Sequence, residues 1–271
     1  MPSTAIQLLI AALALYACGA AAGLSVLAGL KRARNAAFAL PVAGAILQSI
    51  SSVMALVSRS QETVAYSSGI PLIEYALRLD AISAVFSLAL GLLAAAVSVY
   101  SFGYFAAASR TRMGVLAFFY NVLLLSLTLV FTAANAFFFL IAWEVMAASA
   151  YCLVSADHEK EETRHAGLLF LIMSHAGTGL LIVGFLLLAS ASGSLDFASF
   201  HLLGSELPPL QGGIVLLLFL MGFGVKAGII PLHIWLPAAH PVAPSNVSAL
   251  MSGIVIKTGI YGMVRVLFDF Y

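Results

Sequence analysis

The sequence predicts an all-α polytopic membrane protein with about eight transmembrane helices. Of its 271 residues, 62% are hydrophobic and only 8% are charged, whereas a soluble domain needs about 25% charged residues to cover its surface. Several apolar runs reach the roughly 20 residues with which a helix crosses a bilayer. These runs are continuous and lack period-2 alternation, which excludes a β-barrel. The lipid bilayer is therefore the first partner that the sequence predicts.

The first apolar segment is a retained helix, because Lys and Arg follow the run "MPSTAIQLLIAALALYACGAAAGLSVLAGLKRAR" instead of preceding it as in a signal peptide. Seven further segments are long enough to span. We expect the eight spans, to within a few residues, at about 5–30, 37–58, 79–101, 114–132, 136–154, 166–190, 212–239 and 246–267.

Two loops have structure of their own in this prediction. The loop between the second and third spans, "RSQETVAYSSGIPLIEYALR", carries β-branched and aromatic residues around Ser-Gly, a pattern typical of a small hairpin. The loop between the sixth and seventh spans, "SASGSLDFASFHLLGSELPPLQGG", mixes apolar and polar residues, and we expect it to lie along the membrane surface.

The basic residues predict the orientation. Positive residues stay in cytoplasmic loops, and the loops after the first, third and fifth spans hold seven of them, against three on the opposite side. We therefore expect a multi-pass protein of the inner (cytoplasmic) membrane with its N-terminus outside. The net charge of +1 gives no reason to expect nucleic acid as a partner. The seven are Lys31, Arg32, Arg34, Arg110, Arg112, Lys160 and Arg164, and the three are Arg59, Arg78 and Arg265.

Three ionisable residues fall in the middle of spans. Glu144 lies in "FFFLIAWEVMAASAYCLV", Lys226 lies midway along the seventh span, and Lys257 is central in the eighth. A charge at the bilayer centre costs roughly 2.5–3.5 kcal/mol on the lenient insertion scale. A structural Glu–Lys pair that only joins helices is one interpretation. We favour an ion or proton path.

Prolines interrupt the seventh span close to Lys226. Pro231 lacks an N–H, and its ring clashes with the carbonyl of Ala227, so the helix should break within a turn of the lysine. Free carbonyls at that break suit an ammonium, and broken helices occur at membrane depth only inside protein or beside water. Pro237 and the prolines after it are predicted to end the second half of the helix. Ser245 or Asn246 is predicted to cap the next one.

Glycines accompany the lysine in the seventh span. They let helices approach one another closely in a membrane, and their depth in lipid excludes a nucleotide-binding loop. They are Gly222, Gly224 and Gly228.

Three histidines are candidate proton relays, because imidazole titrates near neutral pH. His175 lies near the centre of the sixth span. His233 follows the break, where it either hydrogen-bonds the freed backbone or relays a proton. His240 lies near the predicted cytoplasmic end and connects the path to bulk water.

The motif around these residues resembles a known family. Lys226, "PLHIWLPAAHPVAPSNVSALMSG", "IKTGIYG" and the mid-helix Trp143–Glu144 are similar to the antiporter-like proton-translocating subunits of respiratory complex I, Mrp-type antiporters and membrane-bound hydrogenases. The stretch "AHPVAPSNVSALMSGIVIKTGIYGMVR" is most similar to the branch of hydrogenase-4 and of formate hydrogenlyase subunit 3. Asn246 departs from that branch, where a histidine is expected.

The resemblance implies roles for the intramembrane charges. In the family, a Glu on the fifth helix pairs with a Lys on the broken seventh helix, and a Lys or His on the eighth continues the path; these roles fall on Glu144, Lys226 and Lys257. A lysine keeps its proton while a carboxylate is close and releases it when the carboxylate moves away or is neutralised. The chain itself is then not catalytic and binds neither cofactor nor metal, and the redox centres are expected in partner subunits.

The resemblance also implies a domain organisation and partners. Residues 1–112 would be an N-terminal three-helix segment and residues 113–271 one five-helix antiporter-like repeat. The second, inverted repeat of the family is absent, so we expect a fragment or a truncated gene product. The expected partners are other antiporter-like and membrane subunits and a peripheral redox arm.

Other functions stay open at this stage. The driving complex could instead be an NADH-quinone oxidoreductase or an Mrp-type cation/proton antiporter. Two alternatives belong to different classes: a structural membrane anchor for a peripheral enzyme, and an electron carrier with haem between His175 and His233 or His240.

Overall fold

The computed structural model describes residues 3–30, 32–59, 61–67, 74–105, 108–203 and 207–270. Within these ranges, eight helical segments are long and apolar enough to cross a membrane, which confirms the predicted fold class. The first six are α1 (Thr4–Leu27), α2 (Ala33–Ser58), α3 (Ala81–Tyr104), α4 (Arg110–Thr132), α5 (Ala136–Val154) and α6 (Glu161–Ser192). The seventh is α8 (Pro209–Ala227), and the eighth runs from Ser245 to Asp269.

The eighth span is not one regular helix. It begins as α10 (Ser245–Leu250), passes through a π-helical turn at Met251–Val255, continues as α11 (Ile256–Arg265) and ends in a second π-helical turn at Val266–Phe270. The predicted side-chain cap at its start is wrong, because Pro244 occupies the cap position. The side chain of Asn246 instead donates a hydrogen bond to Ser101 Oγ of α3 at 3.0 Å.

Polar side chains start several of the helices. Each accepts a hydrogen bond from a backbone N–H in the first turn, which is otherwise unpaired. These caps are Ser3 for α1, Asp80 for α3, Ser109 for α4 and Asn135 for α5.

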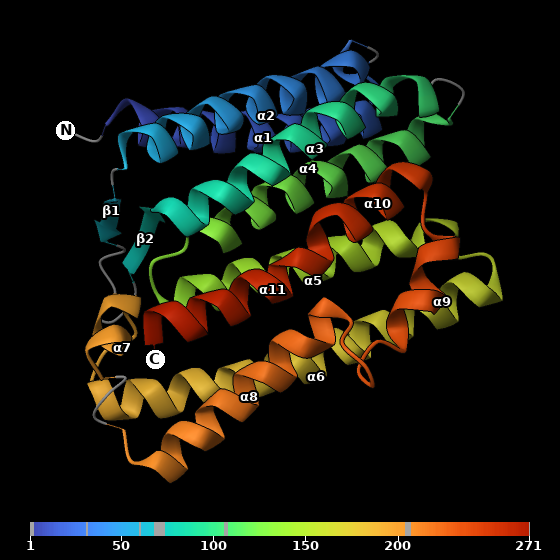
Figure 1. The fold of residues 1–271 in the computed structure, drawn as a ribbon. Helices are drawn as coiled ribbons and strands as arrows, with labels where there is room; N and C mark the ends of the chain where they lie inside the picture. The colour runs from blue at the N-terminus through green and yellow to red at the C-terminus, as the bar shows by residue number, and fades with distance from the viewer. Residues whose placement is uncertain are drawn as a thin grey trace.

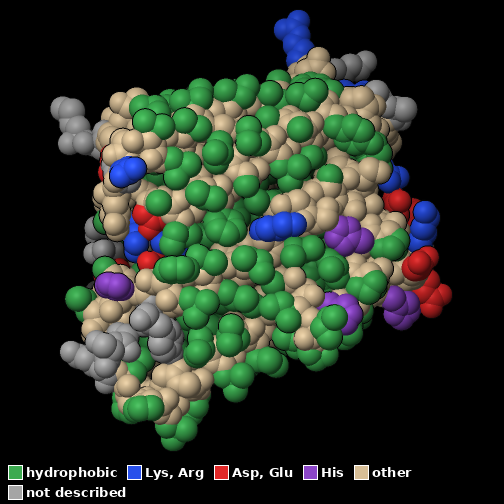
Figure 2. Space-filling view, viewed as in Figure 1, with side chains coloured by type: hydrophobic (Ala, Val, Ile, Leu, Met, Phe, Trp, Pro, Cys, Tyr) green, Lys and Arg blue, Asp and Glu red, His purple; other side chains and the backbone are tan. Residues whose placement is uncertain are grey.

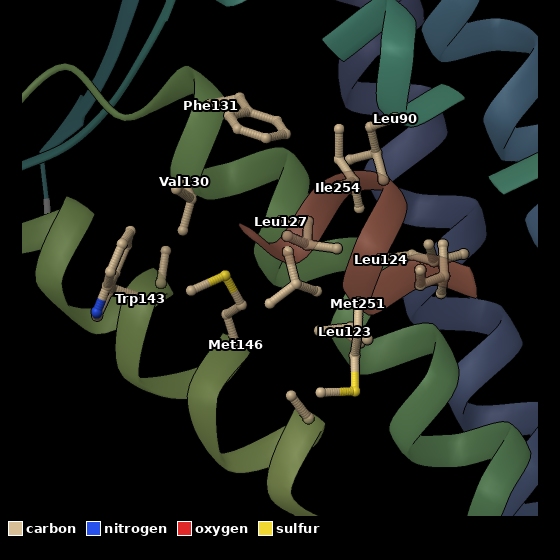
Figure 3. Packing of buried hydrophobic residues seen from close by; sticks show 14 of the residues in the cluster. Leu90, Leu123, Leu124, Leu127, Val130, Phe131, Trp143, Met146, Met251 and Ile254 are labelled. Atoms are coloured by element: carbon tan, nitrogen blue, oxygen red, sulfur yellow. The ribbon is translucent and has the colours of Figure 1, made fainter. Parts of the chain in front are cut away.

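The spans pack side by side, and α4 lies at the centre of the bundle (Figure 1). It contacts α1 on one side and α5 on the other, while α6, α8 and α11 complete the opposite half. Figure 3 shows how apolar side chains fill the space between α4, α5 and the π-helical turn: Leu123 and Leu127 face Met146, Met251 and Ile254. This interior holds the site-bearing helices against one another.

Buried hydrogen bonds tie the first three spans to α4. Tyr16 and Thr128 both donate to Gln48 Oε1, at 2.8 and 3.1 Å, and Gln48 Nε2 donates to the carbonyl of Ser87. All four residues are fully buried. Such interhelical bonds matter in lipid, where packing and hydrogen bonds associate helices without a hydrophobic driving force.

The predicted hairpin is present. β1 (Glu62–Ser67) and β2 (Glu74–Leu79) pair antiparallel, with Thr63 opposite Arg78. The expectation for the loop after the sixth span is wrong in part, because its short helix α7 (Phe197–Leu203) inserts Phe197 and Phe200 into the core. Their rings pack on Phe185 of α6, so the segment closes one end of the bundle.

The loops predicted to share one side of the membrane do lie at one end of the bundle (Figure 1). Arg34 donates to the carbonyl of Phe105 at the end of α3, and Arg112 pairs with Asp157 after α5 at 2.7 Å. Lys31 lies outside the described residues. That this end is cytoplasmic stays a prediction.

Candidate functional site

The predicted break in the seventh span is present directly after Lys226. Helix α8 ends at Ala227, and Gly228 follows with φ of 68°, a left-handed conformation that suits glycine. The chain resumes as α9 (Trp235–Val242), with Pro231 inside the break. The sequence predicts close packing at Gly228, and the structure gives this glycine a second role, which is to end α8.

The freed carbonyls at this break are not the partners of the lysine, contrary to our expectation. The N–H of Ile229 donates to Gly224 O at 3.0 Å, and the indole N–H of Trp235 donates to Val225 O at 2.7 Å. Backbone and indole thus occupy the carbonyls of Gly224 and Val225, and the ammonium of Lys226 donates elsewhere.

Lys226 is only 2% exposed and lies between α5 and α6. Its ammonium donates to Ser174 Oγ at 3.3 Å. It also lies 4.6 Å from the ring centre of Phe170 and 5.9 Å from that of Trp143, distances at which an aromatic face attracts a cation. The lysine is therefore buried among a hydroxyl and two aromatic rings.

Two glycines allow this burial. A Cβ at Gly177 would lie 3.0 Å from Gly222 O, and a Cβ at Gly222 would lie 2.9 Å from Gly177 O. Helices α6 and α8 thus meet backbone to backbone about one turn from Ser174 and Lys226. The predicted role of Gly222 in close packing agrees with this geometry.

Glu144 contacts a histidine and not the lysine. Its Oε2 lies 3.4 Å from His175 Nε2, while Nδ1 of that ring lies 3.0 Å from the carbonyl of Leu171. The two ring nitrogens of His175 thus lie near a carboxylate of α5 and a carbonyl of its own helix. The other carboxylate oxygen, Oε1, is buried and has no hydrogen-bond partner.

Glu144 and Lys226 still influence each other. They form no ion pair within 4 Å, but an electrostatic interaction between them acts on the lysine. The structure thus brings together three of the predicted site residues, Glu144, His175 and Lys226, around Ser174 and the two rings.

Lys257 and His240 form a separate group. Lys257 is exposed, and its ammonium donates to the carbonyl of Ser252 in the π-helical turn. Ser252 Oγ donates to Ser248 O at 3.0 Å, and Ser248 Oγ lies 2.9 Å from His240 Nδ1. Polar groups therefore lie at intervals from His240 of α9 to Lys257 of α11, although the bonds form no continuous chain, because Ser252 and Lys257 each donate to a backbone carbonyl.

This second group lies on an apolar surface. Figure 2 shows Lys or Arg and His side chains close together within a largely hydrophobic face, the face on which α9, α10 and α11 turn towards the viewer in Figure 1. The structure does not bring Lys257 into contact with Lys226, although the two helices that carry them touch.

The remaining predicted residues have simpler positions. His233 is half-buried in the break, and its Nδ1 has no hydrogen-bond partner, so it does not bond the freed backbone through that atom. Pro237 lies in the first turn of α9, where a missing N–H breaks no helical bond. The helix is not broken at Pro237, contrary to the prediction.

Sequence reasoning missed the surroundings of the lysine. Ser174 and Phe170 lie one turn apart on α6 and both face Lys226, and Ser174 directly precedes His175, which was predicted. Among the described residues, no group of three or more His, Cys, Asp or Glu side chains is arranged to hold a metal ion.

The fold and this site define a class: a polytopic membrane helix bundle with a buried cation beside a broken helix. Residues 133–271 match the transmembrane family described as NADH:quinone oxidoreductase/Mrp antiporter. The chain belongs to this family.

Relatives agree with the resemblance. The chain is 42% identical over 193 residues to hydrogenase-4 component B of Escherichia coli, covering 71% of this chain and 28% of that protein. It is 32% identical over 200 residues to formate hydrogenlyase subunit 3 of the same organism, covering 74% and 31%. The chain thus spans less than a third of these relatives.

A solved structure shares the fold. A chain of the membrane-bound sulfane sulfur reductase, an archaeal respiratory membrane complex, superposes with a TM-score of 0.82 at 23% identity. The match covers 97% of this chain and 54% of that one.

Proposed function

We propose that this chain is a proton-translocating membrane subunit of a redox-driven energy-converting complex, of the membrane-bound hydrogenase or formate hydrogenlyase type. The observation that carries the proposal is Lys226, a buried ammonium beside a helix break that contacts no carboxylate among the described residues. A lysine in such a place can gain and lose its proton, which a charge fixed in an ion pair does not do readily.

The polar residues around Lys226 supply the first part of a proton path. In the structure, Glu144 contacts His175 and leaves Lys226 with a hydroxyl and two rings. If the carboxylate turns from His175 towards Lys226, it holds the proton on the lysine. Return of the His175–Glu144 pair favours release.

The second part of the path runs through the group of Lys257. We propose that the proton passes from Lys226 towards Lys257, and that water beside the polar groups of Ser252, Ser248 and His240 carries it from Lys257 to the bulk. We assign the step between the two groups to His233, which lies in the break between α8 and α9 and whose Nδ1 has no hydrogen-bond partner among the described residues.

The partners follow from the exposed position of Lys257. A lysine that faces lipid is costly, so we expect protein to cover the apolar face around it, supplied by further membrane segments of the complex. Redox centres belong to a peripheral arm. The protein is proposed to lie in the inner membrane with its N-terminus outside, because the end that holds most basic residues should be cytoplasmic.

Two other functions are alternatives: a subunit of a different driving complex, and a structural anchor. An NADH-quinone oxidoreductase or Mrp-type complex would use the same proton path, and neighbouring genes distinguish these complexes. A purely structural anchor would need no buried lysine, and removal of Lys226 would leave ion movement unchanged.

The proposal is tested in vesicles that contain the complete complex. We expect Glu144→Gln and Lys226→Ala to abolish proton uptake, followed with a pH-sensitive dye, while the assembled complex stays in the membrane. Lys160→Ala is the matched control, because it removes a lysine whose side chain is 74% exposed. Unchanged proton uptake in Lys226→Ala would contradict the proposal.

A further inference from the structure

A second buried cation lies near the end of α11. The side chain of Arg265 is 5% exposed, and its guanidinium donates to both oxygens of Asp80, at 2.6 Å each. Ser83 Oγ accepts a further bond at 2.6 Å, and Asp269 Oδ2 accepts one at 2.9 Å. All three nitrogens are used, because Nε donates to Tyr261 OH at 2.9 Å.

The partners of Arg265 belong to other elements of the bundle. Asp80 caps α3 by accepting from the N–H of Ser83, and it also pairs with Arg78 of β2 at 2.8 Å. Tyr261 OH donates to the carbonyl of Phe131 in α4 at 2.9 Å. Two arginines thus meet two carboxylates, and this neutral cluster joins α11 to α3, β2 and α4.

The middle of α11 rests on the turns of α8 around Lys226. A Cβ at Gly259 would lie 2.5 Å from Phe223 O and 2.6 Å from the nitrogen of Ala227. A Cβ at Gly262 would lie 2.2 Å from the ring of Phe223. Only glycine at both positions allows this approach, and Lys257 lies two residues before the first of them.

Helix α11 is short and lies between two irregular turns of the same span. The segment has ten residues and is bounded on both sides by π-helical turns, which depart from the regular helical hydrogen-bond pattern and often occur at functional sites. The position of α11 along its axis therefore depends on contacts with other helices.

We propose that the Asp80–Arg265 ion pair is a positioning element that fixes α11 on α8 and so holds Lys257 in register with Lys226. The inference rests on the proposed function. It adds residues to it that act through Lys257 and carry no proton themselves.

Distances between spin labels test the positioning directly. Labels on Ile260→Cys of α11 and Ile172→Cys of α6, both exposed, would be placed in a background with Cys18→Ser and Cys152→Ser. We expect one narrow distance distribution in the parent and a clearly broadened one in Arg265→Gln. A label pair on Ile46→Cys and Ile172→Cys, away from α11, should stay narrow and shows that the variant is folded.

A double variant without charge controls for misfolding caused by a lone buried charge. Asp80→Asn with Arg265→Gln removes both charges of the pair together, so neither partner is left as a lone buried charge. It should also broaden the distribution for α11, since amides do not reproduce the bidentate contact. A distribution that stays narrow in both variants would overturn the proposal.

Proton uptake by the complete complex provides the second readout. We expect Arg265→Gln to lower the rate by about tenfold or more, because a reacting group misplaced by 1 Å loses up to about 10²-fold in rate. Arg265→Lys, which keeps a cation, should recover part of the rate. Arg164→Gln is the control, since Arg164 donates to carbonyls of the loop before its own helix.

Lys257→Ala, measured alongside, separates this proposal from the proposed function. Normal uptake in Lys257→Ala contradicts the proton path. Normal uptake in Arg265→Gln, with uptake lost in Lys257→Ala, contradicts only the positioning role.

Discussion

Lys226 and Arg265 are two buried cations on neighbouring helices, and their surroundings differ. Arg265 is 4% exposed and contacts two carboxylates, a serine and a tyrosine. Lys226 is 2% exposed and contacts one hydroxyl and two aromatic rings, and its nearest candidate carboxylate pairs with His175. The two cations are equally buried, but only Arg265 is paired with carboxylates.

This difference in partners affects how firmly each cation keeps its proton. A guanidinium between carboxylates keeps its charge under all physiological conditions and joins the elements that supply its partners. An ammonium held by neutral groups can change its protonation at a moderate electrostatic cost. The comparison supports our two proposals, in which the Arg265 cluster is structural and the Lys226 site exchanges protons. The predictions below test that division.

The largest effect on stability is expected at Arg265. Arg265→Leu leaves Asp80 and Asp269 without their main partner, and removal of one member of a buried pair costs about 3–5 kcal/mol. Arg112→Leu is the control, because its pair with Asp157 is about half exposed and should contribute at most about 1 kcal/mol. The free energy of unfolding in mixed micelles is measured for both variants. Equal losses would show that the buried pair of Arg265 stabilises the protein no more than the exposed pair of Arg112.

The cluster should also give stability a defined pH dependence. Burial alone would raise the pKa of Asp80, but the hydrogen bond and charge of Arg265, with the Ser83 N–H and Arg78, lower it from 3.8 to about 2. The carboxylate therefore contributes fully above about pH 5, and this contribution is lost progressively as the pH falls through the unfolded value of 3.8 towards 2. Since one pKa unit corresponds to about 1.4 kcal/mol, the loss is about 2 kcal/mol.

Unfolding titrations between pH 6 and pH 2 check this expectation. The difference in free energy of unfolding between the parent and Asp80→Asn should be constant above about pH 5 and shrink below it. A difference that stays constant down to pH 2 would show that the pair with Arg265 does not stabilise the charged carboxylate.

The smallest effect on stability is expected at the functional lysine. Lys226→Met leaves no carboxylate without a contact partner, so the free energy of unfolding should change by at most about 1 kcal/mol. A loss as large as that of Arg265→Leu would mean that Lys226 is a structural charge as well, and the two regions would no longer differ.

Composition and hydropathy predicted the fold because the bilayer dictates both the length and the apolar character of a spanning helix. Apolar runs of sufficient length defined the eight spans, and Ser-Gly between β-branched residues predicted the hairpin. The insertion of α7 was missed because Phe197 and Phe200 gain their partners only in three dimensions.

The site was predicted less completely, for a similar reason. Charge in an apolar segment identified Glu144, Lys226 and Lys257, but the sequence does not say which side chains surround a charge. Contacts between α5, α6 and α8 decide that Glu144 faces His175 and that Lys226 faces Ser174. From the sequence, Arg265 was counted among the basic residues of the non-cytoplasmic loops. Its buried pairing could not be foreseen, because its partner Asp80 lies 185 positions away in the chain.

The central claim is that Lys226 must release its proton, and replacing it by a permanent cation tests this most directly. Lys226→Arg keeps a positive charge in the same pocket, but a guanidinium is not deprotonated in proteins. The account predicts that proton uptake by the complete complex is lost in Lys226→Arg while the amount of assembled complex is unchanged. Proton uptake at the parent rate in this variant would contradict it.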